Sequence, residues 1–152
     1  MSRSRIGYVM LSLVAFAVIL STGCVSKPNR GTYDLYLIPD NYEGTIRVIY
    51  NVEGAPPLER DGKYDIIPVG KDGKYSTSNP MFDYGAVIDQ YYYVDEAGNR
   101  KGIDRFCIHV RGTGGSSGNG TETYHTEIEI TRSECGDDFM LHGSIAANPR
   151  TT

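Results

Sequence analysis

The chain has 152 residues and a formal net charge of −4, with 12 tyrosines, 3 cysteines and no tryptophan. A chain of this length can build one domain with a real hydrophobic core but hardly two. Its acidic balance argues against a nucleic-acid partner, because binding to phosphate backbones requires clustered positive charge. We therefore expect one small domain and no nucleic-acid ligand.

The N-terminus has the layout of an export signal. Arg3 and Arg5 precede an apolar run over residues 6–20, and small residues follow at 21–23. A helix that crosses a bilayer needs about 20 apolar residues, so this shorter run predicts a cleaved signal peptide over residues 1–23. An ordinary secretory peptide and an uncleaved anchor are the alternatives.

The apolar run ends in Leu20-Ser21-Thr22-Gly23-Cys24, which resembles the box that closes lipoprotein signal sequences. The resemblance implies cleavage before Cys24 and attachment of lipid, palmitate included, to that cysteine. Several acyl chains anchor a protein firmly, since each buried methylene contributes about 0.8 kcal/mol. Residues 24–32 contain little that could pack and are expected to be a lipidated tether.

The following residues have the pattern of an all-β domain. Short runs of β-branched and aromatic residues predict strands over residues 33–38, 45–52, 64–69, 86–94, 103–111 and 122–131, with a short one near 139–141. Turn signals separate them at Pro39-Asp40, Gly54-Ala55-Pro56-Pro57, Asp61-Gly62, Asp72-Gly73 and Gly98-Asn99. About seven antiparallel strands predict a β-sandwich over residues 33–145, followed by a flexible tail over 146–152.

Residues 103–111 and 122–131 show the alternation of two strands of a hairpin. The side chains predicted to face the core are Phe106, Ile108, Val110, Tyr124, Ile128 and Ile130, and those predicted to face outward are Arg105, Cys107, His109, Arg111, His125, Glu127 and Glu129. Residues 112–120 between them are predicted to be a flexible hairpin loop. They are not a phosphate-binding loop, because they lack the lysine and lead into a strand.

His109, His125 and Glu127 could in principle hold a zinc ion if the two histidines lay opposite each other on one exposed face. This is the basis of the alternative function, a metal-dependent hydrolase-like enzyme. The favoured interpretation is that these are ordinary exposed side chains. We predict no catalytic residue, metal or cofactor, and the carboxylates Asp95-Glu96 lack the ligand spacing of a calcium loop.

Cys107 and Cys135 predict a disulfide, because an even pair of cysteines in an exported domain is most simply a bridge. Residues 132–135 would have to fold back to bring the two α-carbons within about 7 Å. The alternative is a nucleophilic Cys107 beside His109. It lacks a third orienting residue.

The tyrosine triplet Tyr91-Tyr92-Tyr93 puts Tyr91 and Tyr93 on one face of a strand and Tyr92 on the other. We expect one tyrosine face to be exposed, with Tyr91 and Tyr93 as candidate ligand contacts. The alternative is that these tyrosines simply fit a half-buried strand.

The central residues resemble a family of small bacterial exported proteins and lipoproteins that is classed only as a domain of unknown function. The matching segments are Tyr36-Leu-Ile-Pro39, Tyr42-Glu-Gly44, Val48-Ile-Tyr50, Gly54-Ala-Pro56, Asp61-Gly62, Thr77-Ser78, Tyr84-Gly85 and Tyr91-Tyr-Tyr-Val-Asp95. The resemblance covers residues 36–104 and implies a shared fold without implying a chemistry. Ile38-Pro39 followed by Gly44 is also similar to transthyretin-like sandwiches, and an immunoglobulin-like arrangement is compatible with the strand pattern.

These features favour a noncatalytic module that is anchored by lipid to the cell membrane or outer membrane and faces outside the cytoplasm. Its expected partner is an envelope protein, a peptide or a glycan. A purely structural lipoprotein and an inhibitor of a secreted enzyme fit the same sequence features. The metal-dependent enzyme remains the alternative from a different class.

Overall fold

The computed structural model describes residues 33–81, 88–118 and 121–144. Its strands are β1 (Asp34–Pro39), β2 (Gly44–Tyr50), β3 (Glu59–Asp61), β4 (Tyr64–Pro68), β5 (Lys74–Ser76), β6 (Gln90–Val94), β7 (Arg100–Gly102), β8 (Ile108–Gly118) and β9 (Thr121–Ile130). A 3-10 turn, η1 (Arg105–Cys107), and a short helix, α2 (Asp137–His142), complete the described elements. None of the helices in these ranges is long and apolar enough to cross a membrane.

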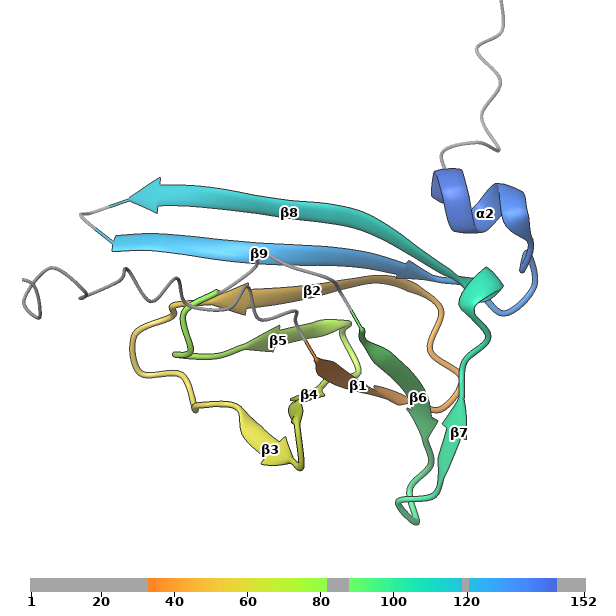
Figure 1. Ribbon diagram of the computed structural model, residues 1–152, viewed down its shortest axis with the longest axis horizontal. Coiled ribbons are helices and arrows are strands. Elements are labelled where there is room, and N and C mark those ends of the chain that lie inside the picture. Colours follow the sequence, from red (N-terminus) through yellow and green to blue (C-terminus); the bar gives the residue numbers. More distant parts are fainter. Residues whose placement is uncertain (1–32, 82–87, 119–120, 145–152) are drawn as a thin grey trace, which may run out of the picture.

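The strands form two sheets (Figure 1). One has five strands in the order β3-β4-β1-β6-β7, and the other has four in the order β5-β2-β9-β8. The all-β fold class predicted from the sequence is confirmed. The predicted signal peptide, the lipidated Cys24, the tether and the C-terminal tail lie outside the described residues.

The hydrophobic core lies between the two sheets. The five-stranded sheet contributes Tyr36, Ile38, Ile67 and Tyr93, and the four-stranded sheet contributes Ile46, Val48, Tyr50, Ile108, Ile128 and Ile130. These positions recur at every second residue of a strand, as burial of one sheet face requires. The core placement of Ile108, Ile128 and Ile130 is thus confirmed. Tyr124, which was expected in the core, is instead 38% exposed. It lies opposite Tyr50, the last residue of β2, at the end of the paired region.

The sheets are mixed, which corrects the expectation of purely antiparallel pairing. β1 pairs in parallel with both β4 and β6, and β2 pairs in parallel with β5. The reason is that β1 and β2 follow each other in the chain but lie in different sheets, so neighbours within a sheet come from distant segments. Parallel neighbours require such crossovers, which local turn signals do not predict.

The glycine-rich stretch is mostly strand, which corrects its prediction as a loop. β8 extends to Gly118, and Gly112 to Gly118 pair with residues of β9 down to Thr121. Residues 103–107, predicted as the start of this strand, lie before it and include η1. A bulge between Val110 and Gly112 shifts the alternation, and Val110 is 52% exposed where a core position was expected.

Residues 139–141 are helical, which corrects the strand predicted there. Asp137 and Asp138 lie in the first turn of α2, where carboxylates interact favourably with the helix dipole. Gly143 follows the helix with a φ of 66°, a conformation that glycine adopts without strain. Phe139 is 5% exposed and fastens the helix to the domain.

Short strands flank three of the predicted turns. Gly62 joins β3 to β4, Gly73 precedes β5 and Gly98 precedes β7, and all three have positive φ. The Asp-Gly and Gly-Asn pairs therefore mark turns, as predicted. The strands beside these turns that the sequence did not predict are β3, β5 and β7. Each has only 3 residues, too few to show alternation in the sequence.

Candidate ligand-binding grooves

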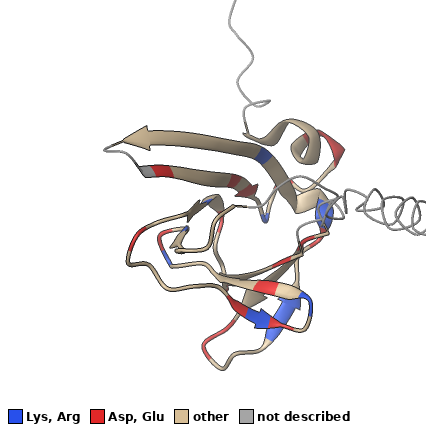
Figure 2. Ribbon diagram, turned by 60° about the vertical axis from the view of Figure 1, so that its left-hand side comes forward, with Lys and Arg blue, Asp and Glu red and all other residues tan. Residues whose placement is uncertain are grey.

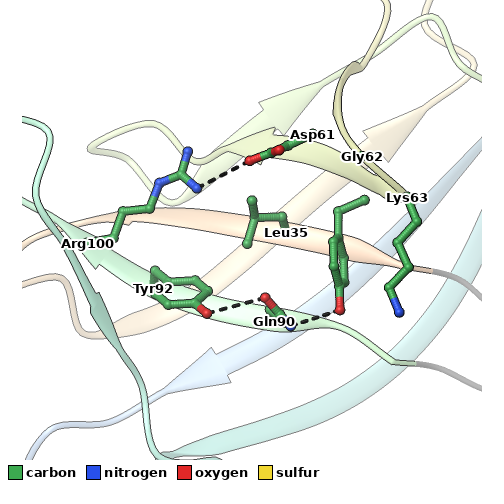
Figure 3. Close-up of a pocket in the computed structure, with 8 residues that line it drawn as sticks. Leu35, Asp61, Gly62, Lys63, Gln90, Tyr92 and Arg100 are labelled. Atoms are coloured by element: carbon green, nitrogen blue, oxygen red, sulfur yellow. Dashed lines mark hydrogen bonds and ion pairs between the residues drawn. The ribbon is translucent and has the colours of Figure 1, made fainter.

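The five-stranded sheet carries a groove on its outer face, the face turned away from the core. This outer groove has a volume of about 420 Å³ and is lined by Leu35, Asp61, Gly62, Lys63, Tyr64, Gln90, Tyr92 and Arg100 (Figure 3). Its floor comes from the central strands β1 and β6, where Leu35 pairs with Gln90. Leu35 is 4% exposed, so the polar and aromatic side chains around it supply most of the accessible surface.

A hydrogen-bonded row of three side chains forms one wall of the outer groove. The Gln90 amide nitrogen donates to the Tyr64 hydroxyl at 2.8 Å, and the Tyr92 hydroxyl donates to the Gln90 amide oxygen at 3.3 Å. One glutamine thus fixes two aromatic rings (Figure 3). The Tyr64 hydroxyl accepts from Gln90, so its own hydrogen remains available to a ligand, as does a second amide hydrogen of Gln90.

An ion pair crosses the outer groove above Leu35. Arg100 and Asp61 approach to 3.6 Å although they come from β7 and β3, which lie at opposite edges of the sheet. The outer face is therefore concave here, and the pair joins its two rims (Figure 3). Both side chains are well exposed, at 41% and 61%.

Lys63 supplies a second cation at the same groove. Its ammonium lies 4.5 Å from the centre of the Tyr33 ring and 5.2 Å from that of the Tyr64 ring. Contact with two aromatic faces stabilises a cation by an electrostatic interaction with the rings. The ammonium is therefore held at the groove wall next to the hydrogen-bonded tyrosine.

A second groove adjoins the first and is more apolar. This seam groove has a volume of about 500 Å³ and is lined by Asp89, Gln90, Tyr91, Tyr92, Gly102, Ile103, Arg105, Ile108, Val110 and Met140. It takes residues from both sheets and from α2. Gln90 and Tyr92 line both grooves, so the two form one continuous surface around Tyr92.

The structure reverses the roles expected within the tyrosine triplet. Tyr93 is 9% exposed and its hydroxyl donates to the Tyr42 carbonyl, while Tyr91 stacks on Tyr36 with ring centres 4.7 Å apart. Burial raises the pKa of the Tyr91 hydroxyl far above its ordinary value. The Tyr93 ring is a core side chain, Tyr91 reaches only the seam groove, and Tyr92 is the tyrosine that faces the outer groove.

The structure does not bring His109, His125 and Glu127 together. His109 pairs with Glu129 across the hairpin, whereas His125 pairs with Gly114, so the two histidines are not opposite each other. Glu127 lies 3.6 Å from Arg47. Within residues 33–81, 88–118 and 121–144, no group of three histidine, cysteine or carboxylate side chains is arranged to hold a metal.

Glu129, expected to be exposed, is a buried carboxylate beneath the end of α2. The hydroxyl of Ser144 donates to it, its side chain lies 3.3 Å from Arg111, and only 7% of the residue is exposed. Burial alone would raise the pKa of Glu129, but the hydrogen bonds from Ser144 and the charge of Arg111 outweigh burial and lower it. The nearby His109 ring is hydrogen-bonded at 3.0 Å to the Met140 carbonyl. This cluster joins α2 to the four-stranded sheet.

Cys107 and Cys135 form a disulfide, with α-carbons 4.3 Å apart. The fold-back of the chain that this requires occurs directly after β9, where the Gly136 amide donates to the Phe106 carbonyl at 3.0 Å. The bridge thus connects η1 to the segment leading into α2. Cys107 is no nucleophile in this arrangement.

Comparison with known proteins gives a family and a structural neighbour. The model of DUF6843, a family of unknown function, matches residues 30–139. A crystal structure described as "Putative Lipoprotein from Bacillus anthracis" is 37% identical, has a TM-score of 0.72, and covers 75% of this chain and 80% of that chain. No curated protein matches. The family match continues past residue 104, where the resemblance read from the sequence ended, and takes in the β8–β9 hairpin and both bridging cysteines.

Proposed function

The chain belongs to the DUF6843 family, and we propose that it is a lipid-anchored, noncatalytic binding module of the bacterial cell envelope. The anchor is supported by the sequence box that ends at Cys24 and by the similarity to the protein described as "Putative Lipoprotein from Bacillus anthracis". The ligand contacts the outer groove, with Tyr92 at its centre.

The observation that carries the proposal is the fixed row of Tyr64, Gln90 and Tyr92 in a groove on the concave outer face of the five-stranded sheet. Aromatic rings that are already held in one orientation lose little conformational freedom when a ligand packs on them. The described residues that line the groove include no histidine, cysteine or serine, and its carboxylate, Asp61, is paired with Arg100. This set of side chains suits recognition more than bond cleavage.

The anchor is tested by the intact mass of the protein extracted from membranes. We expect a chain that begins at Cys24 and carries acyl groups, and a Cys24→Ala variant that is neither processed at this site nor acylated. An unprocessed wild-type chain, or a processed chain of unmodified mass, would contradict lipid anchoring.

The groove is tested by co-sedimentation of a lipid-free form of the mature chain, which begins after Cys24, with washed envelope fragments from its own cells. The lipid-free form is needed because a lipidated chain would enter the fragments through its anchor. Tyr92→Ala should weaken binding by at least about tenfold, because central aromatic contacts dominate binding energies. The matched control is Tyr124→Ala, which removes a tyrosine from β9 that is 38% exposed and does not line the groove. Equal loss in both variants, or no sedimentation of the wild-type chain, would refute the proposal.

A further inference from the structure

We infer that the outer groove selects an acidic saccharide, a sugar chain that carries carboxylate or phosphate groups. This inference rests on the proposed function and names its ligand class. A sugar ring would pack on Tyr92, and its hydroxyls would accept hydrogen bonds from the groove wall. Anionic groups of the chain would face Lys63 and Arg100, which lie on opposite sides of the groove (Figure 3).

The aromatic part of the groove fits a sugar ring. The Tyr92 and Tyr64 side chains are partly buried, and their hydroxyls are both bonded to Gln90, so their rings keep one orientation. A flat tyrosine face packs well against the C–H side of a pyranose while its hydroxyl stays in a polar setting. Fixed rings reduce the entropy lost on binding.

The polar part of the groove offers more donors than acceptors. The hydroxyl hydrogen of Tyr64 and the second amide hydrogen of Gln90 are free to donate, and Arg100 has five N–H donors of which few are used by Asp61. Lys63 adds an ammonium group with three donors. An oxygen-rich ligand can accept all of these hydrogen bonds.

The charges at the groove favour an anion. Lys63 and Arg100 outnumber Asp61 there, although the whole chain has a net charge of −4. Figure 2 shows lysines and arginines of β7 and the β3–β4 region at one end of the molecule, with acidic residues beside them. The Arg100–Asp61 pair is exposed and 3.6 Å apart, and such pairs contribute little stability, so a ligand anion can take over Arg100 at small cost.

The geometry favours a saccharide over a peptide. Peptides that add to a β-domain usually pair with an open sheet edge and place alternate side chains in pockets. The outer groove instead runs over a sheet face, from β7 across β6 and β1 to the β3–β4 turn. Its floor residue, Leu35, is 4% exposed and forms no pocket for an aliphatic side chain.

The test is an array that carries neutral oligosaccharides, uronic-acid and phosphate-bearing oligosaccharides, and acidic peptides, probed with the full mature chain in detergent micelles. We expect the acidic saccharides to bind at least about tenfold more tightly than neutral ones of similar size, with affinity falling as salt is raised. Lys63→Gln and Arg100→Gln should each reduce this preference. The matched control, Lys71→Gln, removes an exposed lysine that does not line the groove and should leave the preference unchanged.

The outcomes separate this inference from the proposed function. Binding of neutral and acidic saccharides alike, or of acidic peptides alone, would overturn the inference, while its loss in Tyr92→Ala would still uphold the groove as the binding site. Binding to nothing on the array would overturn the inference and leave the envelope co-sedimentation to decide the proposed function. A loss of preference in Lys71→Gln equal to that in Lys63→Gln would also overturn it.

Discussion

Glu129 shows how one buried side chain can determine the placement of a distant element. Its carboxylate accepts hydrogen bonds from Ser144, just after α2, and lies 3.3 Å from Arg111 of the bulged strand β8. The same carboxylate therefore contacts both the end of the helix region and β8. Arg111 and Ser144 are themselves exposed, so removing the carboxylate costs mainly its charge-assisted hydrogen bonds. Such bonds contribute more to stability than an exposed ion pair does.

We therefore predict that Glu129→Ala lowers the free energy of unfolding by about 2 kcal/mol. The matched control is Glu127→Ala, two residues earlier on the same face of β9, where the ion pair with Arg47 is more exposed. Its loss should cost less than about 1 kcal/mol. Urea unfolding of both variants measures the difference, and equal losses would contradict the structural role of Glu129.

The same carboxylate makes stability depend on pH. Because the pKa of Glu129 is lower in the folded chain than its ordinary value of 4.5, its ionised form stabilises the fold above that value. This contribution is lost as the pH falls through the lowered folded pKa. Unfolding free energies measured from about pH 6 to about pH 3 should fall less steeply for Glu129→Gln than for the wild-type chain. Parallel curves would contradict this assignment.

The tyrosine triplet shows what can and cannot be predicted from the sequence for a single side chain. Alternation separates Tyr92 from Tyr91 and Tyr93, and the structure agrees. The sequence does not tell which side is the core, because that depends on where the second sheet lies. Burial of Glu129 was equally hidden, since α2 covers it from a segment beyond the strand.

At the scale of elements, Gly73 stands at the close contact between the β4–β5 turn and β2. Its φ is 76°, and a β-carbon there would lie 2.6 Å from the Thr45 carbonyl oxygen and against the Tyr42 hydroxyl. Both the backbone conformation and the lack of space require glycine at this position. Gly98 has a similar φ of 84°, but nothing lies within 4 Å of its β-carbon position.

This pair of glycines allows the two requirements to be separated. Gly98→Ala should cost about 1 to 2 kcal/mol, the strain of a left-handed residue. Gly73→Ala should cost at least about 3 kcal/mol, because a clash with backbone is added. Thermal or urea unfolding gives both values, and a cost for Gly73→Ala no larger than for Gly98→Ala would be inconsistent with the packing described.

The disulfide between Cys107 and Cys135 also holds two elements together. It links cysteines 28 residues apart, and a loop of that length predicts a contribution of about 3 to 4 kcal/mol. Cys107→Ser combined with Cys135→Ser should lose this amount in urea unfolding. It should also speed proteolysis within residues 137–142, because η1 no longer holds the start of α2. Unchanged cleavage there would contradict this role of the disulfide, because it would mean that other contacts hold residues 137–142 in place.

The elements found from the sequence are those with strong local patterns. Runs rich in β-branched and aromatic residues correctly located β1, β2, β4, β6 and β9. The glycine-rich part of β8 has low strand propensity and is held by pairing with β9, which is a tertiary effect. Helix α2 has only 6 residues, too few for a recognisable period, and parallel pairing arises between distant segments.

For the whole molecule, the mixed topology explains the position of the candidate site. Crossovers between the sheets place β1 and β6 inside the five-stranded sheet, so the floor of the outer groove is supported by neighbours on both sides. The rims come from the edge strands β3 and β7, joined by Arg100 and Asp61. The outer groove combines residues from all five strands of its sheet and from the β3–β4 turn. The contacts expected from the sequence, Tyr91 and Tyr93, are not among them, and of the tyrosine triplet only Tyr92 lines this groove.

The proposed binding surface of the anchored module is the outer groove. Its most direct test is a two-dimensional amide NMR spectrum of the full mature chain in micelles, recorded with and without solubilised envelope fragments. We predict shifts confined to the neighbourhood of the groove residues, which are Leu35, residues 61–64, Gln90, Tyr92 and Arg100. Shifts that instead cluster around His109, Glu129 and α2, with the groove signals unchanged, would contradict it.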